Sequence, residues 1–282
     1  SAATDWAWYD RERGATLDIG SNLTSAETVE SGGLLGFNAG GFNVGNLAKV
    51  NTSGANYIAY LFKKGATPGF DIVTYTGTGA NRTINHGLGT APAFVVTKNR
   101  GGTANWGVWH QRLTSAANFL LLNWTGAKAS DATYWNSTPP GESSFSVGSN
   151  VATNANGVQY VSYLFSEVPG FSKFGRYTGN GSADGPFVHT GFKPAFLLIK
   201  RLDAVSGWML FDNTRSPYNA HAYPLLSPHL PDIEVAPHAA HGADFLSNGF
   251  KFRTTDAWHN ASGGSYIYAA FAESPFKYSN AR

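Results

Sequence analysis

Cysteine is absent from the 282-residue chain. This absence excludes disulfides, thiolate zinc sites, iron–sulfur clusters and cysteine nucleophiles. Charged residues are also scarce, at 13%, and Lys+Arg 20 against Asp+Glu 18 leaves a formal net charge of +2. Such a balanced chain has no basic footprint for nucleic acid or for an anionic membrane surface. No apolar run approaches the ~20 residues of a membrane-spanning helix, so we expect neither membrane insertion nor a nucleic-acid partner.

Signatures of common catalytic sites are missing as well. The sequence contains no Walker A, HExxH or GxSxG motif. Glutamates are few, and Glu167 and Glu273 follow equivalent Tyr-rich segments, which favours a structural role over the carboxylate pair of a glycosidase. We therefore expect no enzymatic activity, no catalytic residue and no cofactor.

What the chain does contain is an internal repeat of about 100 residues. Residues 56–62, Asn-Tyr-Ile-Ala-Tyr-Leu-Phe, return at 159–165 and, more weakly, at 265–271. Trp-containing and Gly-Phe segments recur at the same spacing, whereas the Pro-Gly-Phe and Pro-Ala-Phe segments are missing from the first copy. The sequence therefore divides into an incomplete first unit at 1–67, a second at 68–168, and a third with a C-terminal tail at 169–282.

The repeated segments predict β-strands. They are short, rich in Val, Ile, Tyr, Phe and Thr, and bounded by Gly, Pro, Asn and Ser. No segment keeps a helical apolar period over three turns. We predict an all-β protein of tandem antiparallel β-sandwich-like repeats with Gly-rich turns, in which residues 57–62 form a central strand. The in-register aromatic residues expected in the core include Phe94, Trp106, Tyr163, Phe196 and Trp208.

Aromatic residues outside the repeat register indicate the binding surface. They lie in long variable stretches between the Trp and Gly-Phe segments, and such loops commonly carry function. The candidate ligand-binding residues are Trp124, Asp131, Tyr134, Trp135, Asn136, Asp256, Trp258 and His259. Rings would stack on sugar faces while the polar side chains bind hydroxyl groups; the alternative role for each ring is to staple its own loop. The balanced charge favours a neutral glycan, because an acidic one would call for clustered Arg or Lys.

Histidines gather in the last variable stretch. His238 and His241 have the spacing of one helical turn, but Pro237 and Gly242 flank them. They are weak candidates for a metal site, and solvated loop histidines are the simpler interpretation.

Several segments resemble tail-associated proteins of tailed bacteriophages: 84–92, 170–188, 244–251, 266–273 and 275–282. The chain is thus similar to an uncharacterised repeat domain of tail fibre or appendage proteins. The resemblance implies a virion, extracellular location, and as partners a host cell-surface glycan or protein and other virion proteins. It brings no established catalytic residues. A fibre would favour a homotrimer. Met209 is the only methionine, so we expect a C-terminal fragment of a longer protein.

Two alternatives stay open at this stage. Some tail proteins are polysaccharide depolymerases, either glycoside hydrolases or lyases, and a hydrolase would require an acidic pair on one groove. A purely structural capsid or tail decoration domain would instead present ligand-free surfaces on all of its units.

Overall fold

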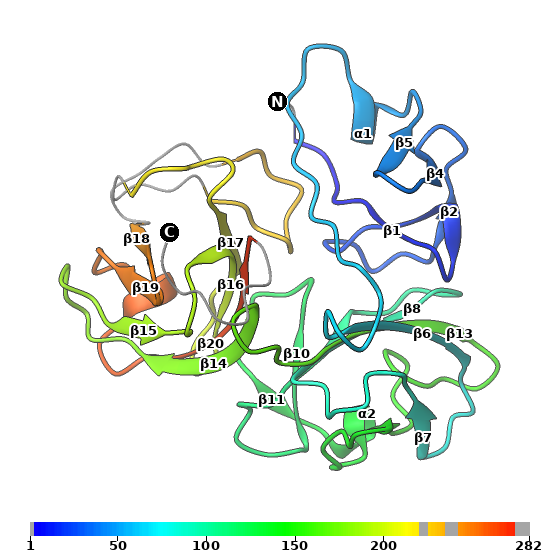
Figure 1. Ribbon diagram of the computed structural model, residues 1–282. Helices are drawn as coiled ribbons and strands as arrows, with labels where there is room; N and C mark the ends of the chain where they lie inside the picture. The colour runs from blue at the N-terminus through cyan, green and yellow to red at the C-terminus, as the bar shows by residue number, and fades with distance from the viewer. Residues whose placement is uncertain (1–2, 220–224, 235–241, 274–282) are drawn as a thin grey trace.

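The computed structural model describes residues 3–219, 225–234 and 242–273. These residues form antiparallel sheets joined by turns and single-turn helices, which confirms the all-β class (Figure 1). In the described ranges no helix has the length and apolar character to cross a membrane.

The largest sheet belongs to the middle of the chain and has the strand order β11-β10-β9-β8-β13-β6. Its strands are β6 (Phe70–Thr76), β8 (Phe94–Asn99), β9 (Gly107–His110), β10 (Asn118–Leu121), β11 (Ala129–Ser130) and β13 (Gln159–Phe165). The Tyr-rich strand β13 pairs with β6 on one side and with β8 on the other. A two-stranded sheet of β7 (Arg82–Asn85) and β12 (Ser144–Val147), together with the helical turn α2 (Ala132–Trp135), packs on the same core.

The C-terminal part contains a four-stranded sheet with the order β14-β20-β16-β17. Its strands are β14 (Ser172–Thr178), β16 (Pro194–Arg201), β17 (Trp208–Asp212) and β20 (Ser265–Ala272). A three-stranded sheet of β15 (Phe187–His189), β18 (Ala243–Leu246) and β19 (Gly249–Phe252) covers it, followed in sequence by α3 (Ala257–Asn260). Here too the Tyr-rich strand, β20, lies between its two longest neighbours.

The N-terminal part has shorter strands. β1 (Trp8–Asp10), β2 (Gly14–Ile19) and β3 (Thr28–Val29) form one sheet, and β4 (Leu34–Phe37) pairs with β5 (Phe42–Val44) ahead of α1 (Ala48–Asn51). Residues 57–62, expected as a central strand, form none. The first copy of the repeat lacks the segments that become β6 and β8 in the middle part, so these residues have no neighbouring strands with which to pair. They run instead as an extended connection toward the centre of the molecule (Figure 1).

Aromatic rings from distant segments meet at that centre. Phe62, Phe165 and Phe271 contact one another, with ring centroids 5.3 Å, 5.1 Å and 5.8 Å apart for the pairs 62–165, 62–271 and 165–271. The expected burial is confirmed for Phe94, Trp106, Tyr163 and Trp208, whereas Phe196 is only partly buried at the edge of this cluster.

Indole N–H groups tie the three parts into a closed ring. Trp106 Nε1 donates to Gly20 O (3.0 Å), Trp208 Nε1 donates to Leu121 O (2.8 Å), and Trp6 Nε1 donates to Ser227 O (3.1 Å). The bonds join the middle part to the N-terminal part, the C-terminal part to the middle part, and the N-terminal part to the C-terminal part. The described residues of the N-terminal and C-terminal parts therefore belong to one packed body with the middle part (Figure 1).

Candidate functional site

The candidate residues at 131–136 form the folded turn α2 rather than an open loop. The Asp131 carboxylate caps the turn by accepting a bond from Thr133 N–H (2.8 Å). Asn136 ends it in a left-handed conformation (φ 52°), and its side-chain oxygen accepts a bond from Asn81 (2.7 Å). Tyr134 and Trp135 point into the core, where Trp135 is 2% exposed. Neither ring is available to stack on a ligand, which corrects the expectation: both fill the space between small sheets, as staples do.

The second candidate group lies on α3. Asp256 caps this turn by accepting a bond from Trp258 N–H (2.7 Å). His259 is fully buried against Phe211 and Phe252, so it is a core residue and not a surface ligand. Trp258, by contrast, is 47% exposed.

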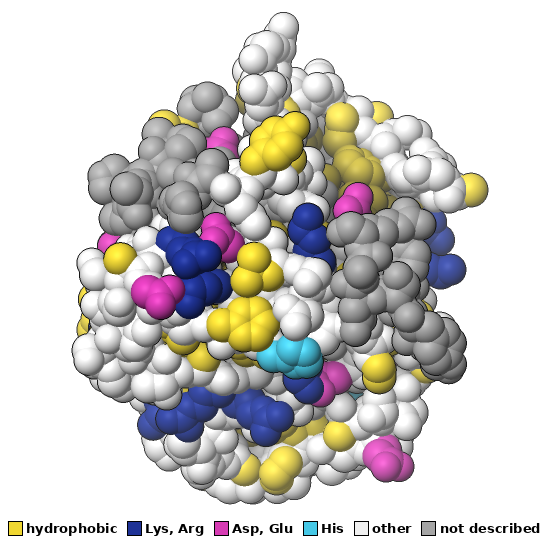
Figure 2. All heavy atoms as spheres, turned by 60° about the vertical axis from the view of Figure 1, so that its left-hand side comes forward, with side chains coloured by type: hydrophobic (Ala, Val, Ile, Leu, Met, Phe, Trp, Pro, Cys, Tyr) yellow, Lys and Arg dark blue, Asp and Glu magenta, His cyan; other side chains and the backbone are white. Residues whose placement is uncertain are grey.

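Three exposed apolar side chains lie on adjoining segments. They are Trp124, which is 50% exposed, Val205 and Trp258, and we call them the tryptophan patch. Ser206 connects the segments: its N–H donates to Thr125 O (2.8 Å) and its hydroxyl donates to Trp258 O (3.5 Å). The patch therefore combines one predicted ring from the middle part with one from the C-terminal part. Elsewhere, on the face that Figure 2 turns forward, apolar side chains lie singly or in small groups among polar ones.

His238 and His241 lie outside the described residues. Within the described ranges, no group of three or more His, Asp or Glu side chains is placed to hold a metal ion.

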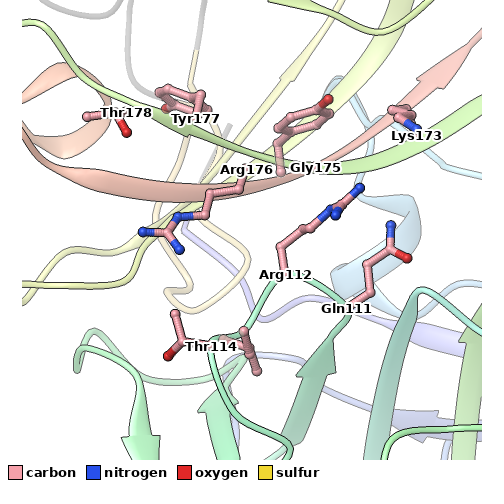
Figure 3. Close-up of a pocket in the computed structure, with 10 residues that line it drawn as sticks. Gln111, Arg112, Thr114, Lys173, Gly175, Arg176, Tyr177 and Thr178 are labelled. Carbon is pink, nitrogen blue, oxygen red and sulfur yellow. The ribbon is translucent and has the colours of Figure 1, made fainter.

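A cleft of about 660 Å³ lies between β14 and the loop that follows β9. Arg112 and Thr114 enter it from the loop, while Arg176 and Thr178 enter it from β14, and Tyr268 on β20 forms part of its wall. Figure 3 shows Arg112 extending from the loop and Arg176 extending from β14, with their guanidinium groups toward opposite ends of the space. We call this the arginine cleft. Sequence reasoning missed it because its residues are far apart along the chain.

One family model matches nearly the whole sequence, residues 1–275. The chain belongs to the DUF7483 family. Its description is a domain of unknown function. No curated protein matches this DUF7483 chain, and no solved structure matches it. Both the tryptophan patch and the arginine cleft lie inside the matched region.

Neighbouring carboxylates in this DUF7483 domain are held by shared arginines. Asp10 and Glu27 both contact Arg13, and Asp212 and Glu234 both contact Arg215. A glycosidase needs one carboxyl group that holds a proton and a second that faces it across the scissile bond. In these two pairs both carboxylates converge on one guanidinium, which fixes the segments that carry them.

Proposed function

We propose that this DUF7483 domain is a non-enzymatic glycan-binding module of a phage tail fibre or related virion appendage, facing the host surface. The observation that carries the binding role is the tryptophan patch, because two indole rings, each close to half exposed, lie on hydrogen-bonded segments. Exposed aromatic rings offer a large apolar contact area at small entropic cost and often dominate recognition energy. The virion assignment rests on the sequence resemblance at 84–92 and 170–188.

We further infer that the chain consists of three tandem units, 1–67, 68–168 and 169–282, the first of them incomplete. The strand order β6-β13-β8-β9 of the middle part corresponds to β14-β20-β16-β17 of the C-terminal part. The side-chain bonds correspond as well: Tyr75 Oη donates to Thr153 O (2.6 Å) as Tyr177 Oη does to His259 O (2.8 Å), and Tyr160 Oη accepts from Ala155 N–H (2.7 Å) as Tyr266 Oη does from Ala261 N–H (2.8 Å). Because the equivalent contacts maintain the fold in both parts, we infer that the residues outside the repeat pattern serve recognition.

The binding role is tested by replacing the two indoles of the patch. Purified Trp124→Ala and Trp258→Ala proteins are measured against immobilised bacterial lipopolysaccharides and capsular polysaccharides. Phe187→Ala is the matched control, because this ring is 46% exposed but lies on β15, outside the patch. We expect each Trp variant to bind about tenfold more weakly, with unchanged melting temperature and an unaffected control. Full affinity in the double Trp variant overturns the proposal.

The same preparation separates the alternatives. Release of new reducing ends or unsaturated sugar ends from the bound polysaccharide would establish a depolymerase. Failure to bind any polysaccharide, with the fold intact, would leave the structural decoration domain.

The proposed homotrimer has its own measurement: light scattering should give three times the mass of the chain, and a single-chain mass overturns the trimer without affecting glycan binding.

A further inference from the structure

The arginine cleft contains two positively charged guanidinium groups that have no hydrogen-bonded or ionic partner among the described residues, unlike those of the other described arginines. Every other arginine in the described ranges has a hydrogen-bonded, ionic or aromatic partner, whereas the guanidinium groups of Arg112 and Arg176 have no hydrogen bond or ion pair there. Lys173, also in the lining, pairs with Glu167 (2.9 Å), and the same carboxylate accepts a bond from Gln111 (2.8 Å). The Glu167 carboxylate is thus already paired with other side chains, and both arginines are free to bind an incoming anion (Figure 3).

The ring of Tyr268 packs behind β14, on the opposite face from Arg176, in a way that depends on a glycine. A Cβ atom at Gly175 would lie 2.3 Å from Tyr268 Oη, so the ring can lie across β14 only because that position has no side chain. The pKa of Tyr268 is raised to about 12, chiefly by burial and further by Glu167, while Arg112 opposes the rise. The phenol therefore adds no negative charge near the two arginines at neutral pH.

A buried histidine holds the two walls together. His110 Nδ1 accepts a bond from the Arg112 N–H (3.0 Å), and its Nε2 donates to Tyr268 O (3.2 Å). The pKa of His110 is lowered to about 3, above all by burial, so the ring is neutral and can both accept and donate. This contact fixes the loop of Arg112 against the strand of Tyr268, and the cleft is in place before a ligand arrives.

The cleft is built where the two longer units differ. In the middle part, the paired strands place Val73 opposite Ser162. In the C-terminal part, Gly175 lies opposite Tyr268, and Arg176 follows at the next position. The residues that make the cleft are therefore departures from the shared scaffold, and the scaffold contacts do not account for them.

We propose that the arginine cleft binds a carboxylate-bearing sugar residue of an acidic polysaccharide. Planar guanidinium groups match a carboxylate through paired N–H donors, better than a spherical cation would. Thr114 and Thr178 supply partners for sugar hydroxyl groups, and about 660 Å³ lies within the usual range of small-ligand sites. The site is separate from the tryptophan patch and does not depend on it. The neutral glycan predicted from the net charge concerns the tryptophan patch, whereas the cleft is proposed from the local distribution of charge.

The test uses oligogalacturonate as the probe and its methyl ester as the neutral counterpart, measured by titration calorimetry on the whole chain. We expect binding of the acid form only, at least about tenfold weaker in Arg112→Gln and in Arg176→Gln, and weakened by added salt. Arg82→Gln is the control, since it removes the same charge from β7, where the guanidinium bonds Thr76 O. Both cleft arginines are exposed, so the melting temperatures of their variants should match that of the parent.

Gly175→Ala supplies a second variant with a different cause. The added methyl group must displace the Tyr268 ring or the strand β14, which carries Arg176, so binding should fall while both guanidinium groups remain. Equal binding of the acid and its ester, or parental affinity in both arginine variants, overturns the proposal. Preference for a sulfated oligosaccharide over the carboxylate also overturns it, because the cleft would then be a site for a tetrahedral anion.

Discussion

Two tyrosine hydroxyl groups donate hydrogen bonds across the boundaries between the three parts of the molecule. Removing these hydroxyl groups tests whether the three parts unfold as one cooperative unit. Tyr60 Oη donates to Asp212 Oδ2 (2.7 Å), and Tyr163 Oη donates to Asp10 Oδ2 (2.8 Å). Each aspartate is almost fully buried and also pairs with an arginine three residues later. The substitutions Tyr60→Phe and Tyr163→Phe delete only the hydroxyl oxygen and leave the ring in place.

The expected cost follows from the charge of the acceptor. A hydrogen bond to a charged group contributes about 1.5–3 kcal/mol. Since each carboxylate keeps its arginine after the substitution, we expect the lower part of that range, about 1.5–2 kcal/mol per variant. For a chain of this size, each such loss should lower the melting temperature by roughly 3–8 °C.

Urea unfolding followed by tryptophan fluorescence and by far-UV circular dichroism measures the effect. Tyr57→Phe is the matched control, because its hydroxyl donates to Ala48 O (2.8 Å) inside the N-terminal part and its ring is 47% exposed. If the three parts unfold as one cooperative unit, Tyr60→Phe shifts a single unfolding transition that both probes detect. A Tyr60→Phe midpoint equal to that of Tyr57→Phe, or a separate early transition of the N-terminal part, would refute the reasoning.

Three further substitutions test the core, a buried histidine and a close backbone approach. Trp208→Ala should cost about 3–5 kcal/mol in urea unfolding, because a fully buried indole and its bond to Leu121 O are lost. Because the pKa of His110 is lowered to about 3, the folded chain binds fewer protons than the unfolded one between about pH 3 and 6.5. Its share of stability is complete above pH 6.5 and declines on acidification, and His110→Gln should flatten this part of the stability curve. Gly179→Ala should cost about 2 kcal/mol, since a Cβ would lie 2.3 Å from Ala261 O, whereas Gly36→Ala, with open space, should be neutral.

The strand content and much of the core followed from local pattern. Short apolar segments bounded by turn residues predicted the strands, and recurrence in register predicted that Trp106 and Trp208 are buried. The prediction was wrong for residues 57–62, whose composition is that of a strand. Strand formation needs a hydrogen-bonded neighbour, and whether one is present depends on distant segments, which composition does not encode.

The candidate site was harder to predict because the residue type of an aromatic side chain does not tell whether that side chain is buried or exposed. Trp124 and Trp135 are both outside the repeat register and both among polar residues, yet one is half exposed and the other is buried. The difference lies in α2, which turns Trp135 onto the core and is too short to leave a helical period in the sequence. Arg112 and Arg176 gave no signal at all, because they line one cleft only when the loop after β9 packs near the distant strand β14.

The three boundaries between the parts differ in the residue at one position of the Trp-containing segments. Asp10, His110 and Asp212 each stand four residues after a tryptophan, namely Trp6, Trp106 and Trp208. Each of the two aspartates pairs with an arginine of its own part and accepts a hydrogen bond from a tyrosine of another part, so a buried, paired carboxylate lies at each of these boundaries. The third boundary has a neutral imidazole at that position and Leu113 where the others have the arginine, so the equivalent ion pair is absent. The loop of Arg112 is held there by His110 and by Gln111, whose amide donates to Glu167 (2.8 Å) and to Phe174 O (2.7 Å). The Arg112 guanidinium extends into the cleft, where an anion could pair with it.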